Sequence, residues 1–242
     1  MSKLYVVGIG PGAPRDMTLR ARAALDEAEV IAGYGVYVDL VRAMYSNKEY
    51  LVTPMRRESE RCRAAIEAAC EGKTVAMISS GDAGVYGMAG LVLELAQGKG
   101  IDIEIIPGVT AALSGGAVLG APLTHDFAVI SLSDLLTPWE KIERRLECAA
   151  AADFCIALYN PASHRRADYL RRACEILLRH ASAETVCGVV RNIGRVGESM
   201  ETMTLRELAD YSADMFTTVF IGNSQTRIID GRIVTPRGYR DV

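Results

Sequence analysis

SSGDAGVYG, at residues 79–87, directly follows the apolar run Thr74–Ile78 and leads into a helical pattern. A second turn of small residues, PGVTA at 107–111, stands in the same place after the apolar run Ile103–Ile106. In open α/β sheets, ligands bind outside the carboxyl ends of the strands, and glycine-rich turns let the backbone approach a ligand closely. The two turns therefore predict an α/β enzyme that acts on a small molecule.

The rest of the chain repeats this alternation of short apolar strands and helices, which is typical of an α/β fold. We expect strands at Leu4–Ile9, Val30–Gly33, Thr74–Ser79, Ile103–Ile106, Ala128–Leu132, Phe154–Tyr159, Val186–Arg191 and Thr217–Gly222. We expect helices at Leu19–Ala28, Glu58–Cys70, Val85–Ala96, Ala111–Leu119, Pro138–Ala151, Arg166–Leu178 and Leu205–Tyr211. Thr204 followed by Glu207 predicts a capping box at the start of the last helix.

The alternation breaks at residues 120–126, GAPLTHD, and restarts after them. We therefore expect two α/β domains, residues 1–120 and 121–242, with a ligand cleft between them. The second domain is expected to end in antiparallel strands, because Asp230-Gly231 is a strong signal for a two-residue hairpin turn.

Composition excludes several classes of function. The 242 residues carry a formal net charge of −3, so no basic field indicates a nucleic acid partner. No apolar run approaches the ~20 residues that span a bilayer, and the N-terminus lacks the layout of a signal peptide. We therefore expect a cytoplasmic protein with no membrane partner.

Metal binding is also poorly supported. The six cysteines show no C-x-x-C spacing, and the chain has only three histidines. We expect the cysteines to be buried, reduced thiols that pack as small hydrophobic side chains. No metal site is predicted.

A nicotinamide dehydrogenase is an alternative, because GIGPGA at residues 8–13 fits the dinucleotide fingerprint G-x-G-x-x-G/A. Two features argue against it. Pro11 removes a backbone N–H from a loop that would offer such groups to a pyrophosphate. The second strand ends in Gly33-Tyr34, where an acidic residue would bind the ribose. The motifs of phosphate-binding loops and of serine hydrolases are absent.

Two acidic positions allow more than one interpretation. The Asp82 carboxylate can accept hydrogen bonds from backbone amides at a helix start, or from a hydroxyl or ammonium group of a ligand. His125 and Asp126, at the break between the domains, can transfer protons, or the histidine can simply be satisfied by its neighbour. Trp139, at a helix start, is expected to pack rather than to stack on a ligand.

Taken together, the motifs resemble the tetrapyrrole methyltransferases of cobalamin biosynthesis, specifically the precorrin-3B C(17)-methyltransferase group, whose anaerobic members act on cobalt-factor III. The resemblance covers essentially the whole chain. The GIGPG and GD loops mark the superfamily, whereas THDF with SLSDLLTPW marks the group. It is carried by GIGPG (8–12), Gly33-Tyr34, SSGDAGVYGMAG (79–90), PGVTA (107–111), GAPLTHDFAVISLSDLLTPW (120–139), Tyr159-Asn160-Pro161, Val190-Arg191-Asn192 and Arg237-Gly238-Tyr239.

The resemblance implies a two-domain tetrapyrrole methylase fold, a homodimer, and S-adenosylmethionine bound in the cleft. Carried over residue by residue, it places the cofactor against Gly81, Asp82, Ala83, Val85, Tyr86, Thr110, Ala111, Tyr159, Asn160, Asn192, Thr218 and Val219. On the substrate side it places Gly10, Pro11, Gly12, Ser131 and Ser133. The implied reaction methylates C(17) of precorrin-3B or cobalt-factor III and contracts the ring. The residues of the SLSDLLTPW segment are more similar to those of the anaerobic members, which favours the cobalt-containing substrate.

The chemistry of such a reaction suggests further residues. Methyl transfer is an in-line displacement whose rate depends on alignment, which suits a site rich in glycine and backbone contacts. Ring contraction needs proton transfers, for which His125, Asp126 and Tyr34 are the candidates. The substrate carries several carboxylates, and the doublet Arg56-Arg57 is expected to bind them. Arg191 and Arg195, which also stand at element ends, are weaker candidates for the same task.

Other functions remain open at this point. The chain could be a methyltransferase of the same superfamily that acts at another corrin position or on diphthamide, or a non-catalytic tetrapyrrole-binding protein. Some relatives of the group carry an additional C-terminal iron–sulfur segment. We expect no cluster in this chain, because no cysteine follows Cys187.

Overall fold

The computed structural model describes residues 3–163 and 167–240. The chain divides into two compact units, Met1–Ala111 and Ala112–Val242. This division lies before the break expected at residue 120, so that almost all of the helix that precedes the break belongs to the second unit. Among the described residues, no helix is long and apolar enough to cross a membrane.

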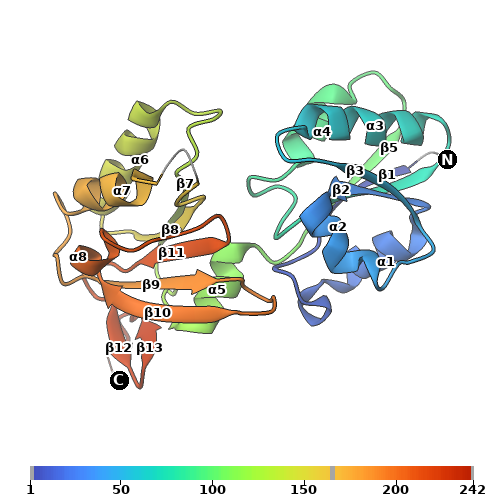
Figure 1. The fold of residues 1–242 in the computed structure, drawn as a ribbon. Helices are drawn as coiled ribbons and strands as arrows, with labels where there is room; N and C mark the ends of the chain where they lie inside the picture. The colour runs from blue at the N-terminus through green and yellow to red at the C-terminus, as the bar shows by residue number, and fades with distance from the viewer. Residues whose placement is uncertain (1–2, 164–166, 241–242) are drawn as a thin grey trace. The chain divides into compact units, whose positions relative to one another are not determined.

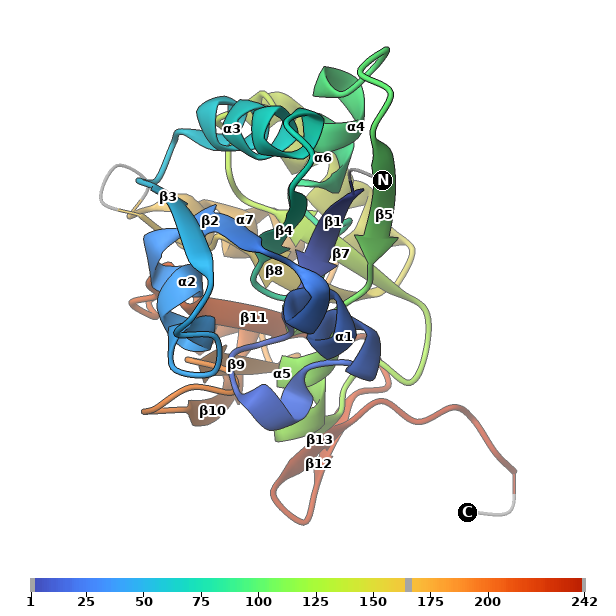
Figure 2. The ribbon, with the colours of Figure 1, turned by 90° about the vertical axis from the view of Figure 1, so that its right-hand side faces the viewer.

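The first unit is built on a parallel sheet with the strand order β3-β2-β4-β1-β5. Its strands are β1 (Lys3–Gly8), β2 (Val30–Tyr34), β3 (Glu49–Thr53), β4 (Thr74–Ser79) and β5 (Asp102–Ile106). One face is covered by α1 (Leu19–Glu27) and α2 (Gly35–Arg42), and the other by α3 (Glu58–Cys70) and α4 (Ala89–Leu95) (Figure 1; Figure 2). A short 3-10 helix, Pro14–Asp16, precedes α1.

Alternate residues of each strand pack against the two helical layers. In β1, Leu4 and Val6 pack with α3 and α4, whereas Tyr5 and Val7 pack with α1 and α2. Because both faces are buried, the central strands appear in the sequence as continuous apolar runs. The carboxyl ends of β1, β4 and β5 lie at one edge of the sheet, because the three neighbouring strands run in the same direction.

The sequence prediction omits two elements of this unit, β3 and α2. The residues of β3 are exposed or half-buried, because β3 is an edge strand with one neighbour. Helix α2 begins at Gly35, directly after β2, and no side chain caps its amino end. β3 offers only the three-residue apolar run 50–52, and α2 lacks a capping signal, so both elements are harder to recognise from the sequence.

The helix expected at Val85–Ala96 begins only at Ala89. Before it, the chain turns back on itself: Tyr86 has a φ of 54°, and the Ala89 amide donates to the Ala83 carbonyl at 3.0 Å. A Cβ at Gly87 would clash with the same carbonyl group. The second half of SSGDAGVYG is therefore a tight loop and not the first turn of a helix.

The second unit contains a mixed sheet with the order β10-β9-β11-β8-β7, in which β7 and β8 run parallel and the other neighbours antiparallel. Its strands are β7 (Phe127–Ser131), β8 (Cys155–Tyr159), β9 (Val186–Arg191), β10 (Ser199–Thr204) and β11 (Thr217–Ile221). Helices α6 (Trp139–Ala151), α7 (Tyr169–Leu177) and α8 (Leu205–Leu208) pack on one face (Figure 1). Helix α5 (Ala111–Leu119) packs against β11 of the sheet, where the absence of a side chain at Gly115 makes room for the Phe220 ring.

The predicted antiparallel ending of the second unit is confirmed. β12 (Arg227–Ile229) and β13 (Arg232–Val234) form a hairpin, and β13 also pairs with β6 (Gly120–Ala121). The turn residues Asp230 and Gly231 have φ values of 48° and 75°, the left-handed pair that a two-residue turn requires.

The helix ends of this unit differ partly from the prediction. The capping box is confirmed, because Thr204 Oγ1 accepts from the Glu207 amide at 3.2 Å and the Glu207 carboxylate accepts from the Thr204 amide at 2.8 Å. However, α8 is a single turn that ends at Leu208 instead of reaching Tyr211. Helix α7 begins at Tyr169, and its expected start at residue 166 lies outside the described residues.

The cysteines are only partly as expected. Four are buried, but Cys70 and Cys148 are exposed at the surface of α3 and α6. Burial raises the pKa of the Cys62 thiol to about 11 and that of the Cys174 thiol to about 12. The Cys62 and Cys174 thiols therefore remain protonated at neutral pH.

Candidate active site

Three loops meet at the carboxyl edge of the first unit's sheet. The loop after β1 and the loop after β4 exchange two backbone hydrogen bonds, from Gly10 N to Gly81 O at 3.0 Å and from Gly81 N to Gly10 O at 2.7 Å. A Cβ at Gly8 would lie 2.7 Å from the Gly108 amide nitrogen, and one at Gly108 would clash with the Gly81 carbonyl oxygen. Gly8 and Gly108 are therefore required by the close approach of the backbones, whereas Gly10 and Gly81 have left-handed φ values of 74° and 69°. We call this contact the glycine junction, formed by Gly8, Gly10, Gly81 and Gly108.

Asp82 fastens the glycine junction. Its Oδ1 accepts from the amides of Gly84 at 2.7 Å and Val85 at 3.2 Å, and its Oδ2 accepts from the Gly108 amide at 3.0 Å. Of the two interpretations of Asp82, the structure therefore shows the hydrogen bonds to backbone amides. Both oxygens are used within the protein, so this carboxylate shapes the loop after β4 and joins it to the loop after β5.

The other predicted cofactor residues of the first unit lie beside the junction. A Cβ at Gly81 would lie 3.6 Å from Thr110 Cα and 3.7 Å from the Ala111 amide nitrogen, so the two loops are in direct contact. Ala83 is completely buried, whereas Tyr86 is exposed on the tight loop before α4. The structure thus brings this predicted set together at one edge, with the protein backbone as its main surface.

Tyr34 and the Arg56-Arg57 doublet also lie toward this edge. Tyr34 is the last residue of β2 and pairs in register with Thr53, the last residue of β3, which the doublet follows closely. The Tyr34 ring packs edge-to-face on Tyr37 at 5.3 Å. Arg57 is exposed and forms an ion pair with Glu60 on its own helix at 3.1 Å.

Arg61 is a site-forming residue that the sequence analysis misses. Its side chain is buried, and its Nη1 donates to Thr53 Oγ1 at 2.7 Å, which ties the end of β3 to α3. The segment that carries Arg56, whose φ of 65° is left-handed, is held between these two points. The sequence could have indicated that Arg61 is buried, because it adjoins Cys62, Ala65 and Ile66 on the apolar face of α3.

The second unit gathers its predicted cofactor residues at one edge of its own sheet. Tyr159 ends β8, and its hydroxyl accepts from the Ala112 amide at 2.6 Å. Asn160 follows it with a left-handed φ of 54° and donates from Nδ2 to Ser131 Oγ at 2.9 Å. Asn192, with a φ of 50°, follows β9, and its amide donates to Phe216 O at 3.2 Å.

The two remaining cofactor candidates of this unit lie on β11. The Thr218 side chain is buried near the strand end, one position from Thr217, which pairs with Arg191. Val219 is completely buried in the core formed with α6 and α7. The Val219 side chain is therefore committed to packing, and a ligand could meet only its backbone.

His125 and Asp126 lie at the opposite edge of this sheet. They precede β7, whereas Ser131, Tyr159 and Asn160 stand at the ends of β7 and β8, and five residues of strand span about 16 Å. The pair, for which the sequence predicts proton transfer during ring contraction, therefore lies away from the edge that carries Tyr159 and Asn160, and this role stays a prediction. His125 Nδ1 accepts from the Asp126 amide at 3.0 Å, which matches the alternative of a histidine satisfied by its neighbour.

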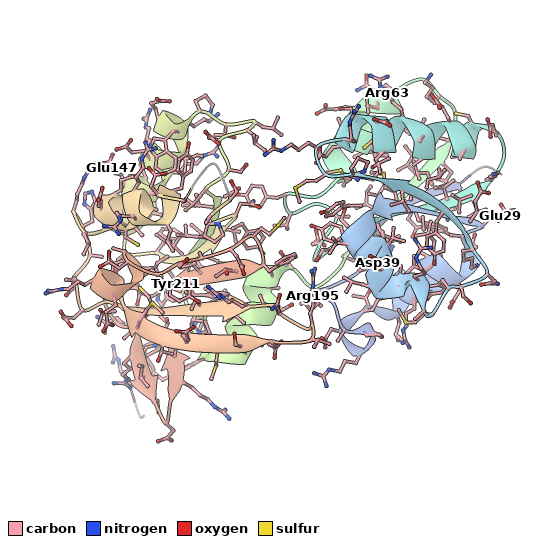
Figure 3. All side chains as sticks on the ribbon, in the orientation of Figure 1. Glu29, Asp39, Arg63, Glu147, Arg195 and Tyr211 are labelled. Carbon is pink, nitrogen blue, oxygen red and sulfur yellow. The ribbon has the colours of Figure 1, made fainter. Side chains whose placement is uncertain are left out.

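Arg191 and Arg195 have different contacts; Figure 3 labels Arg195 and Tyr211, the residue whose ring Arg191 contacts. The Arg191 guanidinium donates to the Ser212 carbonyl and lies over the Tyr211 ring at 5.3 Å. Burial raises the pKa of Tyr211, and the positive charge of Arg191 opposes that rise. Arg191 is therefore held by contacts within the second unit, and the carboxylate-binding role considered from the sequence stays a prediction. Arg195 lies over the Phe216 ring at 5.6 Å.

No cluster of His, Cys, Asp and Glu side chains in residues 3–163 and 167–240 could hold a metal ion. The two edges instead offer amides, hydroxyls and close-packed backbone. Such surfaces bind neutral or polar groups of a small molecule by hydrogen bonds and shape.

Several curated proteins are similar to this chain over nearly its whole length. The sequence pattern of the family described as Tetrapyrrole (Corrin/Porphyrin) Methylases matches residues 3–209. A protein of Salmonella typhimurium, named Probable cobalt-factor III C(17)-methyltransferase, is 50% identical over 98% of this chain and 99% of its own length. One of Sinorhizobium sp, named Precorrin-3B C(17)-methyltransferase, is 42% identical over 98% and 96%. Some other relatives are longer, and the chain spans about half of their length.

The fold agrees with these sequence similarities. The crystal structure of the methyltransferase CobJ matches this structure with a TM-score of 0.91 at 37% identity, covering 98% of this chain and 100% of that one. The expected tetrapyrrole methylase fold is thereby confirmed. The chain belongs to the tetrapyrrole (corrin/porphyrin) methylase family.

Proposed function

We propose that the protein transfers the methyl group of S-adenosylmethionine to C(17) of precorrin-3B or cobalt-factor III and promotes contraction of the ring, as a step of cobalamin biosynthesis. The names of the two relatives support the position and the substrate. The observation that carries the proposal is the glycine junction fastened by Asp82, because it builds a rigid, backbone-lined surface where ligands of such sheets bind.

We assign cofactor binding to two sets of residues. In the first unit they are Gly81, Asp82, Ala83, Val85, Tyr86, Thr110 and Ala111; in the second they are Tyr159, Asn160, Asn192, Thr218 and Val219. Asp82 acts by holding its loop, and Val219 acts through its backbone, since their side chains are already engaged. The cleft, the homodimer and the cytoplasmic location expected from the sequence remain predictions.

The main contribution of the protein to methyl transfer is the alignment of the substrate carbon with the methyl group, and acid–base chemistry contributes less. S-adenosylmethionine supplies an electrophilic methyl group, and the residues of the site have to fix the direction from which the substrate carbon meets it. A loop tied by three hydrogen bonds to one carboxylate is suited to this task, because little freedom is left to lose on binding.

We assign substrate binding to Gly10, Pro11, Gly12, Ser131, Ser133, Arg56 and Arg57. Arginine pairs well with carboxylates, of which the proposed substrate has several. Arg61 is a positioning residue for the doublet, because it fixes the end of β3. Tyr34 remains the candidate for proton transfer, because it stands at the end of β2.

The experiment that tests the proposal is a pair of measurements on the purified protein. S-adenosylmethionine and NADH are titrated separately by calorimetry, and cobalt-factor III and precorrin-3B are then incubated anaerobically with S-adenosylmethionine. We expect heat from S-adenosylmethionine, none from NADH, and a product heavier by one CH2 whose label, from a 13C-methyl donor, is found at C(17).

Each other outcome contradicts a named part of the proposal. Label at another carbon would show that the enzyme methylates a different position of the macrocycle. Binding of both ligands without turnover would show a tetrapyrrole-binding protein. Heat from NADH alone would show that GIGPGA binds a dinucleotide after all.

A further inference from the structure

The segment that joins β7 to α6, residues 132–138, is fixed at both ends. At its start, Leu132 is completely buried and its amide donates to the Tyr159 carbonyl at 2.9 Å. In its middle, the Asp134 carboxylate accepts from the Tyr169 hydroxyl at 2.7 Å. At its end, the Trp139 ring packs on the Tyr169 ring with 4.6 Å between centroids. The segment is therefore an anchored loop at the strand-end edge of the second unit.

Two consecutive leucines project from this anchored loop into solvent. Leu135 is 62% exposed and Leu136 is 98% exposed, although their neighbours Leu132 and Trp139 are buried or packed. An isolated exposed leucine is common in proteins and needs no explanation. Two adjacent ones, held in place by contacts that do not include their own side chains, indicate a surface that is covered when the protein works.

A cation stands beside the loop. The guanidinium carbon of Arg172 lies 4.1 Å from the centroid of the Trp139 ring and 5.1 Å from that of the Tyr169 ring. Stacking on two rings restrains the side chain, so that less freedom is lost when the group pairs with an anion. The same edge therefore combines an apolar tip with an oriented positive charge.

We propose that Leu135 and Leu136 contact the face of the tetrapyrrole substrate and that Arg172 pairs with one of its peripheral carboxylates; this rests on the function proposed above. A tetrapyrrole is an extended macrocycle with an apolar face and a rim of acetate and propionate groups, which is the complement of this surface. The base of the loop is next to Asn160, which donates to Ser131 at the same edge. The loop thus determines specificity for a large macrocycle and has no direct part in cofactor binding.

The test compares four variants of the protein under anaerobic conditions. The double variant L135A/L136A removes the apolar tip. The matched control is L93A, which removes another exposed leucine, 49% exposed on α4. R172Q removes the charge, with R172K as the conservative variant. Binding of cobalt-factor III is followed by its absorbance, binding of S-adenosylmethionine by calorimetry, and oligomeric state by sedimentation.

For L135A/L136A we expect a Kd for cobalt-factor III raised about tenfold or more, because apolar area no longer leaves water on binding. Its affinity for S-adenosylmethionine and its thermal midpoint should stay as in the wild type and in L93A. R172Q should weaken binding and flatten its dependence on salt, and R172K should restore that dependence in part.

Three outcomes would overturn the inference. If L135A/L136A binds cobalt-factor III like the wild type, the leucines do not touch the substrate. If it dissociates an oligomer while binding is unchanged, the tip is covered by a second copy of the chain. If the wild type itself binds S-adenosylmethionine but no tetrapyrrole, the proposed function fails together with the inference.

Discussion

The strand-end edges of the two units are built in different ways. In the first unit, backbone meets backbone: Gly10 and Gly81 exchange two hydrogen bonds, and Asp82 binds three amides. In the second unit, side chains contribute to the contacts, as where Asn160 donates to Ser131 Oγ and the Tyr159 hydroxyl accepts from the Ala112 amide. A backbone junction requires that side chains be absent, whereas a side-chain network requires particular functional groups. The two edges should therefore respond to opposite kinds of substitution.

Adding one methyl group to the glycine junction should have the largest effect. In G108A, the new Cβ would clash with the carbonyl oxygens of Gly81 and Gly8, and the backbones have to move apart. We expect the free energy of unfolding in urea to fall by about 3 kcal/mol, with loss of S-adenosylmethionine binding in calorimetry.

The matched control is G90A. A Cβ at Gly90, within α4, meets nothing within 4 Å, so that stability should stay the same or rise by up to about 1 kcal/mol. If G108A were as stable as G90A and still bound the cofactor, the junction would not be the rigid element of the first unit.

Asp82 should rank second. D82N keeps the shape of the side chain but replaces one acceptor oxygen by a donor, which leaves at least one of the Gly84, Val85 and Gly108 amides without its partner. We expect a loss of about 1–3 kcal/mol in urea unfolding and weaker binding of S-adenosylmethionine.

The control D39N changes an exposed aspartate on α2, whose carboxylate lies 3.6 Å from Arg42, and should cost less than about 0.5 kcal/mol. A D82N protein of unchanged stability that no longer bound the cofactor would show instead that the carboxylate acts directly on the ligand.

At the second edge, two substitutions of Asn160 separate backbone from side chain. N160G keeps the left-handed conformation at a φ of 54° and removes the hydrogen bond to Ser131, whereas N160A also places a Cβ in that conformation. We expect both to weaken S-adenosylmethionine binding similarly in calorimetry. N160A should lose about 1 kcal/mol more in thermal or urea unfolding. Normal binding by N160G would mean that this edge also acts through its backbone.

The sequence predicts the first edge better than the second for a physical reason. Glycines that allow backbones to touch form short motifs, so SSGDAGVYG and PGVTA can be recognised locally and placed at strand ends. Asn160, by contrast, has its partner Ser131 on another strand. No local pattern records such a pairing, and the motifs at the strand ends of the second unit are individually weak.

The errors follow the same division. Strand β3 is missed because its apolar run is only three residues long, and helix α2 because no side chain caps its start. The pair His125-Asp126 was assigned to a site from its nearness to the break between domains. It precedes β7, however, and therefore lies at the edge of the sheet away from Ser131 and Tyr159, so that its part in the reaction stays a prediction.

The thiols give a smaller and purely local contrast between surface and core. Cys70 and Cys148 are exposed and should react within minutes with a disulfide reagent at pH 8, whereas the four buried cysteines should react only on unfolding. Because burial raises the pKa of Cys62 to about 11 and of Cys174 to about 12, thiolate forms more easily in the unfolded chain. Stability should therefore fall as the pH rises above the ordinary thiol pKa. Rapid reaction of more than two thiols would contradict the packing of the core.

The smallest effect is expected at the far edge of the second unit. H125Q and D126N change residues that lie about 16 Å of strand away from Ser131 and Tyr159, so kcat for methyl transfer should stay within about twofold of the wild type. Y34F, at the end of β2, is the comparison, because its hydroxyl is the remaining candidate for proton transfer. The pH profile of kcat should change in Y34F and stay the same in H125Q. A tenfold lower kcat in H125Q at unchanged KM would show that His125 takes part in the reaction. Both edges of this sheet would then contribute residues to catalysis.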